Sequence, residues 1–233
     1  MSWLKDVGNI FVAPSYTFNA IKNAGWKRSI APFLILVVLG AFSMGILQDL
    51  MQDVQYDKAI KNIEESTRIP DDQKSQFIET INDRMSNPQL WQILLGWLAG
   101  LLSYPIRVFI TTLFVMIIGN TILGGSVKYG QLMIMTAYVY LISILEMIVK
   151  IPLMLSEWSI DIYTGLGLLG IGESGSFVNN FMAGFDLFGL WRIILLAIGM
   201  GIFYEKETKP FLWALLIYWV IQITLFAGLG MIF

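Results

Sequence analysis

The sequence predicts an all-α polytopic membrane protein, a bundle of five transmembrane helices. Of its residues, 56% are hydrophobic and only 14% are charged, whereas a soluble domain carries about 25% charged residues. Apolar stretches long enough to cross a bilayer recur along the chain, since about 20 helical residues span the ~30 Å hydrocarbon core. The one sizeable polar segment shows helical rather than alternating spacing of its apolar residues. The chain therefore contains helices and no predicted strand.

Residues 1–28 predict an N-terminal amphipathic segment that lies in the membrane interface. Its first apolar residues have the spacing of one helical face: Trp3, Leu4, Val7, Ile10 and Phe11. Pro14 should interrupt this helix, and a second short helix should follow it. The bases expected at the lipid headgroups are Lys5, Lys22, Lys27 and Arg28. The alternative is a docked cytoplasmic helix that only covers the bundle.

The first span is predicted over residues 29–48, followed by an acidic extra-cytoplasmic helical hairpin over residues 49–89. Gly40, Ser43 and Gly45 give the span a strip of small residues suited to close helix contact. Ile69 and Pro70 separate the two helical runs of the hairpin. Its carboxylates lack the D-x-D-x-D-G spacing of a calcium loop, so a solvated acidic face is favoured over a metal site.

The second span is predicted over residues 90–122 and the third over residues 128–155. Pro105 lies inside the second span and should kink it, and Arg107 follows within the apolar run. Near the end of the third span, Glu146 and Lys150 form an i, i+4 pair in the favourable order. Both spans therefore carry charge inside the membrane.

The remaining segments are a Gly/Ser-rich outer loop over residues 156–183, a fourth span over residues 184–204 and a fifth over residues 211–229. The loop contains no lysine or arginine. The fourth span begins with Asp186 and carries Arg192 within its apolar run. Because an ionisable group in a membrane costs a few kcal/mol unless it is paired or hydrated, this span should face the interior of the bundle.

The distribution of basic residues predicts the orientation. The bases on one side of the predicted spans are Lys22, Lys27, Arg28, Lys128, Lys206 and Lys209. Positive residues in short loops favour the cytoplasm. We therefore expect a cytoplasmic N-terminus and an extra-cytoplasmic C-terminus.

The intramembrane charges predict a polar cluster that joins the second, third and fourth spans. Its members are Arg107, Glu146, Lys150, Asp186 and Arg192. Opposite charges in a low dielectric would fix the register of the helices. The same groups could instead bind a lipid headgroup or line a path for a solute. A third interpretation is that Asp186 only caps its helix.

Composition excludes most catalytic chemistry. The chain has no cysteine and no histidine, which removes thiol nucleophiles, disulfides, Cys/His zinc sites and histidine proton relays. The net charge of −2 and the absence of basic clusters argue against nucleic-acid binding. The sequence predicts no enzyme, no cofactor and no metal site.

Three groups of residues, in order along nearly the whole chain, resemble the Yip1-domain family in its bacterial form. The first is Phe11, Pro14, Thr17, Phe18 and Ile21, followed by Trp26 and Pro32. The acidic helical loop and then Gly124, Gly125 and Ser126 with Lys128 and Tyr129 come next. The last is Asp186, Leu187 and Phe188, with Trp191 and the run from Leu195 to Gly199.

The resemblance implies five membrane helices with a cytoplasmic N-terminus, and for a bacterial member we expect the inner (plasma) membrane. Eukaryotic relatives act in vesicle trafficking and associate with Rab GTPases, whereas no defined activity is implied for bacterial members. We therefore expect a non-enzymatic integral membrane scaffold or adaptor that binds membrane partners or organises lipids. The alternative is a small-solute or lipid transporter that uses the polar cluster. The expected partners are membrane lipids and a second copy of the chain or another membrane protein.

Overall fold

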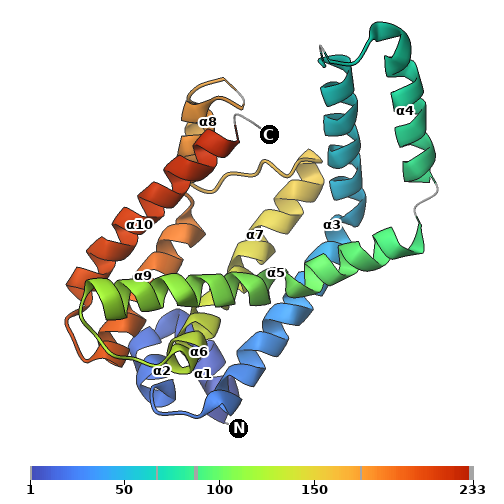
Figure 1. The fold of residues 1–233 in the computed structure, drawn as a ribbon. Helices are drawn as coiled ribbons and strands as arrows, with labels where there is room; N and C mark the ends of the chain where they lie inside the picture. The colour runs from blue at the N-terminus through green and yellow to red at the C-terminus, as the bar shows by residue number, and fades with distance from the viewer. Residues whose placement is uncertain (1, 67, 87–88, 174, 231–233) are drawn as a thin grey trace. The chain divides into compact units, whose positions relative to one another are not determined.

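The computed structural model describes residues 2–66, 68–86, 89–173 and 175–230 (Figure 1). Within these ranges the chain is helical, and no strand occurs apart from an isolated bridge between Gly165 and Asp186. Small parts of the predicted segments 1–28, 49–89 and 156–183, among them Pro88 and Ser174, lie outside the described residues. The predicted all-α fold is confirmed.

The five predicted membrane spans are also confirmed as helices that are long and apolar enough to cross a bilayer. The described residues contain these stretches at Lys27–Glu64, Leu90–Ile122, Tyr129–Glu157, Leu187–Tyr204 and Thr208–Leu229. The main helices are α1 (Ser2–Val12), α2 (Pro14–Ile21), α3 (Ile30–Glu64), α4 (Asp71–Ser86), α5 (Leu90–Met116), α6 (Tyr129–Tyr140), α7 (Ile142–Glu157), α8 (Phe177–Ala183), α9 (Leu187–Tyr204) and α10 (Thr208–Leu229). Short helical turns are η1 (Trp26–Ser29), the π-helix η2 (Ile117–Ile122) and η3 (Leu166–Leu169).

The helices form two compact units. The first contains the described residues of Met1–Val37, Tyr104–Glu146 and Tyr163–Phe233, and the second those of Val38–Ser103 and Met147–Ile162. The division falls within α3, α5 and α7, so each of these helices contributes to both units.

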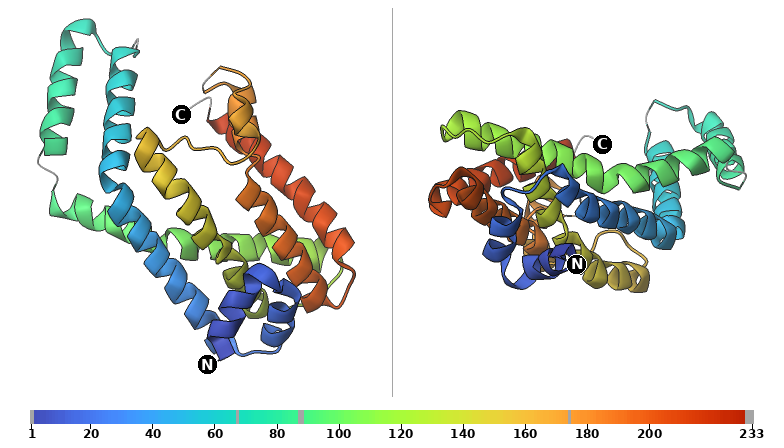
Figure 2. Two further views of the ribbon diagram at one scale, coloured as in Figure 1. Left: turned by 180° about the vertical axis from the view of Figure 1, so that it is seen from behind. Right: turned by 90° about the horizontal axis from the view of Figure 1, so that it is seen from below.

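Helix α9 lies at the centre of the first unit. It packs against α10, α6 and α2, and the views in Figures 1 and 2 show α9 and α10 side by side. The largest buried side chains of α6 and α9 include Met135, Tyr138 and Leu195. From α1 and α2, Ile10, Phe18 and Ile21 also have no exposed surface. The N-terminal helices are therefore part of the packed core of this unit.

In the second unit, α3 and α5 approach each other at glycines. A Cβ added to Gly40 would lie 2.2 Å from the carbonyl oxygen of Gly100, so the two backbones meet with no room for a side chain. Helix α4 is joined to α3 by the Tyr56 hydroxyl, which donates to Asn82 Oδ1 at 2.8 Å.

Two helix boundaries differ from those drawn on the sequence. Helix α3 continues without a break to Glu64, through the point at residue 48 where the apolar run ends. The third apolar run consists of two helices, because Leu141 donates its backbone N–H to Tyr138 O, three residues earlier. This tighter i→i−3 bond interrupts the α-helical pattern between α6 and α7.

In the outer loop, η3 and α8 provide short regular elements. The bends beside them use glycine: Gly170 has a φ of 59° and Gly172 a φ of 88°. These left-handed conformations are accessible to glycine without steric cost.

Candidate functional site: a polar network at the first turns of α9

The first turn of α9 is capped by Asp186. Its Oδ1 accepts hydrogen bonds from the backbone N–H of Phe188 at 2.9 Å and of Gly189 at 3.0 Å. Its Oδ2 accepts a short hydrogen bond from the Thr164 hydroxyl. The carboxylate therefore satisfies two of the N–H groups that a helix start leaves unpaired, and it complements the positive end of the helix dipole.

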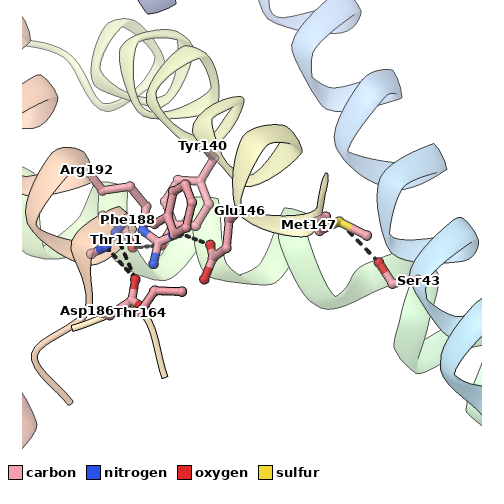
Figure 3. A network of polar contacts seen from close by, with 10 residues as sticks. Ser43, Thr111, Tyr140, Glu146, Met147, Thr164, Asp186, Phe188 and Arg192 are labelled. Carbon is pink, nitrogen blue, oxygen red and sulfur yellow. Dashed lines mark hydrogen bonds and ion pairs between the residues drawn. The ribbon is translucent and has the colours of Figure 1, made fainter. Parts of the chain in front are cut away.

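Arg192, less than two turns further along α9, forms an ion pair with Glu146 at the start of α7. The distance from Arg192 Nη1 to Glu146 Oε2 is 2.5 Å (Figure 3). The Arg192 side chain is 23% exposed and that of Glu146 is 18% exposed. Asp186 and Tyr140 also act electrostatically on the guanidinium. The charges of α9 are thus balanced within the first unit.

A hydroxyl pair extends the network to α5. Thr111 Oγ1 and the Tyr140 hydroxyl lie 2.7 Å apart (Figure 3). Because Tyr140 is the last residue of α6, the network links side chains from α5, α6, α7 and α9. Contacts of this kind fix the rotation of each helix about its axis, since a turned helix would leave polar groups unpaired in a low dielectric.

For the other two residues of the predicted cluster, Arg107 and Lys150, membership of the cluster stays a prediction. Arg107 is exposed, and its guanidinium carbon lies 5.9 Å from the centroid of the Tyr104 ring. Arg107 lies one turn before Thr111 on α5, on the side of the helix that carries the hydroxyl pair. Lys150 lies one turn after Glu146 on α7 and belongs to the second unit.

A second polar network, which sequence reasoning missed, lies where η2 leads into α6. Asn120 accepts from the backbone N–H of Val127 at 3.1 Å and donates to Val127 O at 3.0 Å. The Tyr204 hydroxyl, at the end of α9, donates to Asn120 Oδ1 at 2.8 Å. An asparagine inside an apolar run was the available signal, because a buried amide requires partners.

The Tyr204 ring packs directly against two glycines beside that network. A Cβ added to Gly119 or to Gly125 would lie 2.2 Å from an atom of the ring. Tyr204 is also held by Phe211, whose ring centroid is 5.2 Å away. Gly119 and Gly125 therefore provide space for an aromatic side chain, whereas Gly124, with a φ of 63°, allows the turn.

An ion pair joins the end of α2 to the end of α9, close to the Tyr204 ring in sequence. Lys22 Nζ lies 2.6 Å from Glu205 Oε1, and Lys206 Nζ donates to the carbonyl oxygens of Leu123 and Gly124. The hydrogen bond from Lys22 and its positive charge lower the pKa of Glu205 below the ordinary value of 4.5.

This pair is expected to make stability depend on pH in the acid range. A carboxylate with a lowered pKa in the folded state stabilises the protein above its unfolded pKa, and the contribution is lost as the pH falls through the folded pKa. Glu205→Gln should therefore reduce stability above pH 4.5 and have a diminishing effect below it. Thermal unfolding of both proteins across this range measures the difference. Glu207→Gln, which removes a carboxylate from the same loop, is the matched control, and an equal effect of both variants would contradict the assignment to Lys22.

Among the described residues, no group of three or more acidic, histidine or cysteine side chains is arranged to hold a metal ion. The polar groups described above instead bind one another and the backbone.

Comparison with known proteins returns one family. The family described as the Yip1 domain matches residues 8–229 of the chain. No curated protein and no solved structure is similar enough to the chain to match it.

Proposed function

Because the chain belongs to the Yip1 domain family of membrane proteins, we propose that it is a non-enzymatic integral membrane scaffold or adaptor of the bacterial type. The observation that carries this proposal is the family match, which extends over residues 8–229. In this role the protein binds other membrane proteins or a second copy of itself, and organises the lipids around it. Its N-terminus faces the cytoplasm, as the basic residues near the ends of the spans favour.

The ion pair between Arg192 and Glu146 favours the scaffold function over a transporter with a solute path. The Arg192 charge is met by Glu146, and Asp186 is engaged by two backbone N–H groups and a threonine hydroxyl. A transporter that used this cluster would need its charged groups to be available to a solute. Here they act as fixed connections between helices, which is what a rigid binding platform requires.

The outer face of α10 supports the same function by presenting apolar side chains at a regular spacing. Trp213, Ile217, Ile221 and Leu225 are each more than half exposed. Because they follow one another at intervals of four residues, they form a ridge along one side of the helix. Such a ridge is suited to contact with acyl chains or with a helix of another membrane protein.

The proposal is tested by photo-crosslinking from α10 in native membranes. The chain has no cysteine, so Ile217→Cys carries a photoactivatable label at one defined position. We expect adducts to a specific membrane protein or to a second copy, suppressed by an excess of unlabelled protein. Leu215→Cys is the matched control, because Leu215 is 1% exposed, so its thiol should take up little label and give no intermolecular adducts. Adducts to lipid alone, together with solute uptake by the reconstituted protein, would contradict the scaffold function and favour a transporter.

A further inference from the structure

A groove of about 1010 Å³ opens in the first unit where the chain enters its first span. It lies between α1, the connection from α2 to η1, and the beginning of α3. Its apolar wall includes Trp3, Ala31, Leu34 and Ile35, and its polar rim includes Lys27 and Arg28. Because these residues stand at the start of the candidate span that begins at Lys27, we expect the rim at the depth of lipid headgroups.

Arg28 is held in place on the wall of this groove by a buried carboxylate. Its Nη1 lies 2.5 Å from Asp6 Oδ2, and the Asp6 side chain is only 5% exposed. The Thr17 hydroxyl donates to the backbone oxygen of Asp6 at 3.2 Å, which ties α2 to α1 at this point. A guanidinium has further N–H donors in a fixed planar arrangement, and the Arg28 side chain remains 32% exposed. The ion pair with Asp6 therefore orients an arginine that can also serve a ligand.

The charges at the rim are positive. Lys27 is exposed beside Arg28, and no acidic residue is among the described residues that line the groove. Arginine and lysine together are the usual partners of a phosphate group, the arginine through paired N–H donors and the lysine as a mobile charge. The rim is thus complementary to an anion.

The wall below the rim is complementary to a hydrocarbon chain. Leu34 is 60% exposed and Ile30 is 41% exposed, and both lie on the membrane-spanning part of α3. A soluble anion would make no use of this apolar surface, and an apolar helix would make no use of the two charges. A molecule with an anionic head and an acyl chain uses both.

We infer that this groove binds an anionic phospholipid, with its phosphate on Arg28 and Lys27 and an acyl chain along Leu34 and Ile35. The inference deepens the lipid-organising part of the proposed function, and it rests on that part. The lipid would then fill the space between the N-terminal helices and the first span, joining both to the membrane surface.

Native mass spectrometry of the purified protein, mixed with phosphatidylglycerol or phosphatidylcholine, tests the inference. Wild-type protein should retain phosphatidylglycerol in preference to phosphatidylcholine. Lys27→Gln should weaken phosphatidylglycerol binding about five-fold, since a basic residue near an anionic membrane contributes about 1 kcal/mol. Ala31→Trp places a large side chain against the apolar wall and leaves both charges in place. It should reduce the amount of phosphatidylglycerol that the protein retains. The matched control is Lys5→Gln, whose lysine lies over the Tyr16 ring at 5.3 Å and outside the groove lining.

Three results would overturn the inference. If Lys5→Gln and Lys27→Gln weakened phosphatidylglycerol binding equally, the lipid would be attracted to any basic surface and not to this groove. Complete displacement of the lipid by inorganic phosphate would identify a site for a free anion. Retention unchanged by both Lys27→Gln and Ala31→Trp would place the lipid elsewhere. Because crosslinking from Ile217 is measured on α10, the scaffold function and the lipid site can each fail without the other.

Discussion

Arg192→Leu is expected to lower the free energy of unfolding by about 3 kcal/mol, because it leaves the carboxylate of Glu146 without its guanidinium in a low-dielectric site. The two side chains are 23% and 18% exposed, so solvent screens this pair less than it would a surface ion pair. Equilibrium unfolding of the protein in mixed micelles measures the loss.

The double variant Glu146→Leu/Arg192→Leu provides the decisive comparison. With both charges removed, neither Glu146 nor Arg192 is left without the other, and stability should recover toward that of the wild type. Glu146 takes part in a further interaction, so the coupling energy of the full cycle is a better measure than either single loss. Lys61→Leu is the matched control, because this lysine is 71% exposed in its pair with Glu65 and its replacement should change stability by only about 0.5 kcal/mol. Additive losses in the double variant would show that the two residues do not depend on each other.

Gly40→Ala is the second substitution with a large expected effect, a loss of about 3 kcal/mol. The added methyl group would lie 2.2 Å from the Gly100 carbonyl oxygen. Since that atom belongs to the backbone of α5, the clash cannot be relieved by a change of rotamer, and the two helices must separate. Unfolding in mixed micelles again measures the change.

Gly45→Ala, on the same helix, controls for the effect of replacing a helical glycine. Its Cβ would make an ordinary contact of 3.4 Å with the Trp97 ring. Alanine also has the higher helix propensity, by up to about 1 kcal/mol, so this variant should be neutral or slightly more stable. If Gly40→Ala were tolerated as well as Gly45→Ala, this result would contradict the close backbone contact of α3 and α5 at Gly40.

The spans could be predicted from sequence because length and hydropathy decide them locally. The end of α3 could not be predicted in the same way. Hydropathy reports where apolar surroundings are needed, whereas a helix ends where its hydrogen bonding stops. Polar residues after Gln48 are compatible with a helix, so α3 continues to Glu64 even though the apolar run has ended.

The charged residues show a similar limit. Sequence reasoning could infer that Arg192 needs compensation, because an isolated charge in a membrane is costly. Its contact with Glu146, and the exposed position of Arg107, depend on how each helix is rotated about its axis. That rotation follows from packing between segments distant in sequence. The bond from Tyr204 to Asn120 spans 84 residues, and no local pattern relates the two.

The packing of Tyr204 against Gly119 and Gly125 has a consequence for how the sequence can vary. A bulkier residue at either glycine position has no space while the phenol ring is present, and a small residue at position 204 would leave a void between two segments that now touch. These three positions are therefore constrained to change in concert. Mutational tolerance at any one of them should depend on which residues occupy the other two.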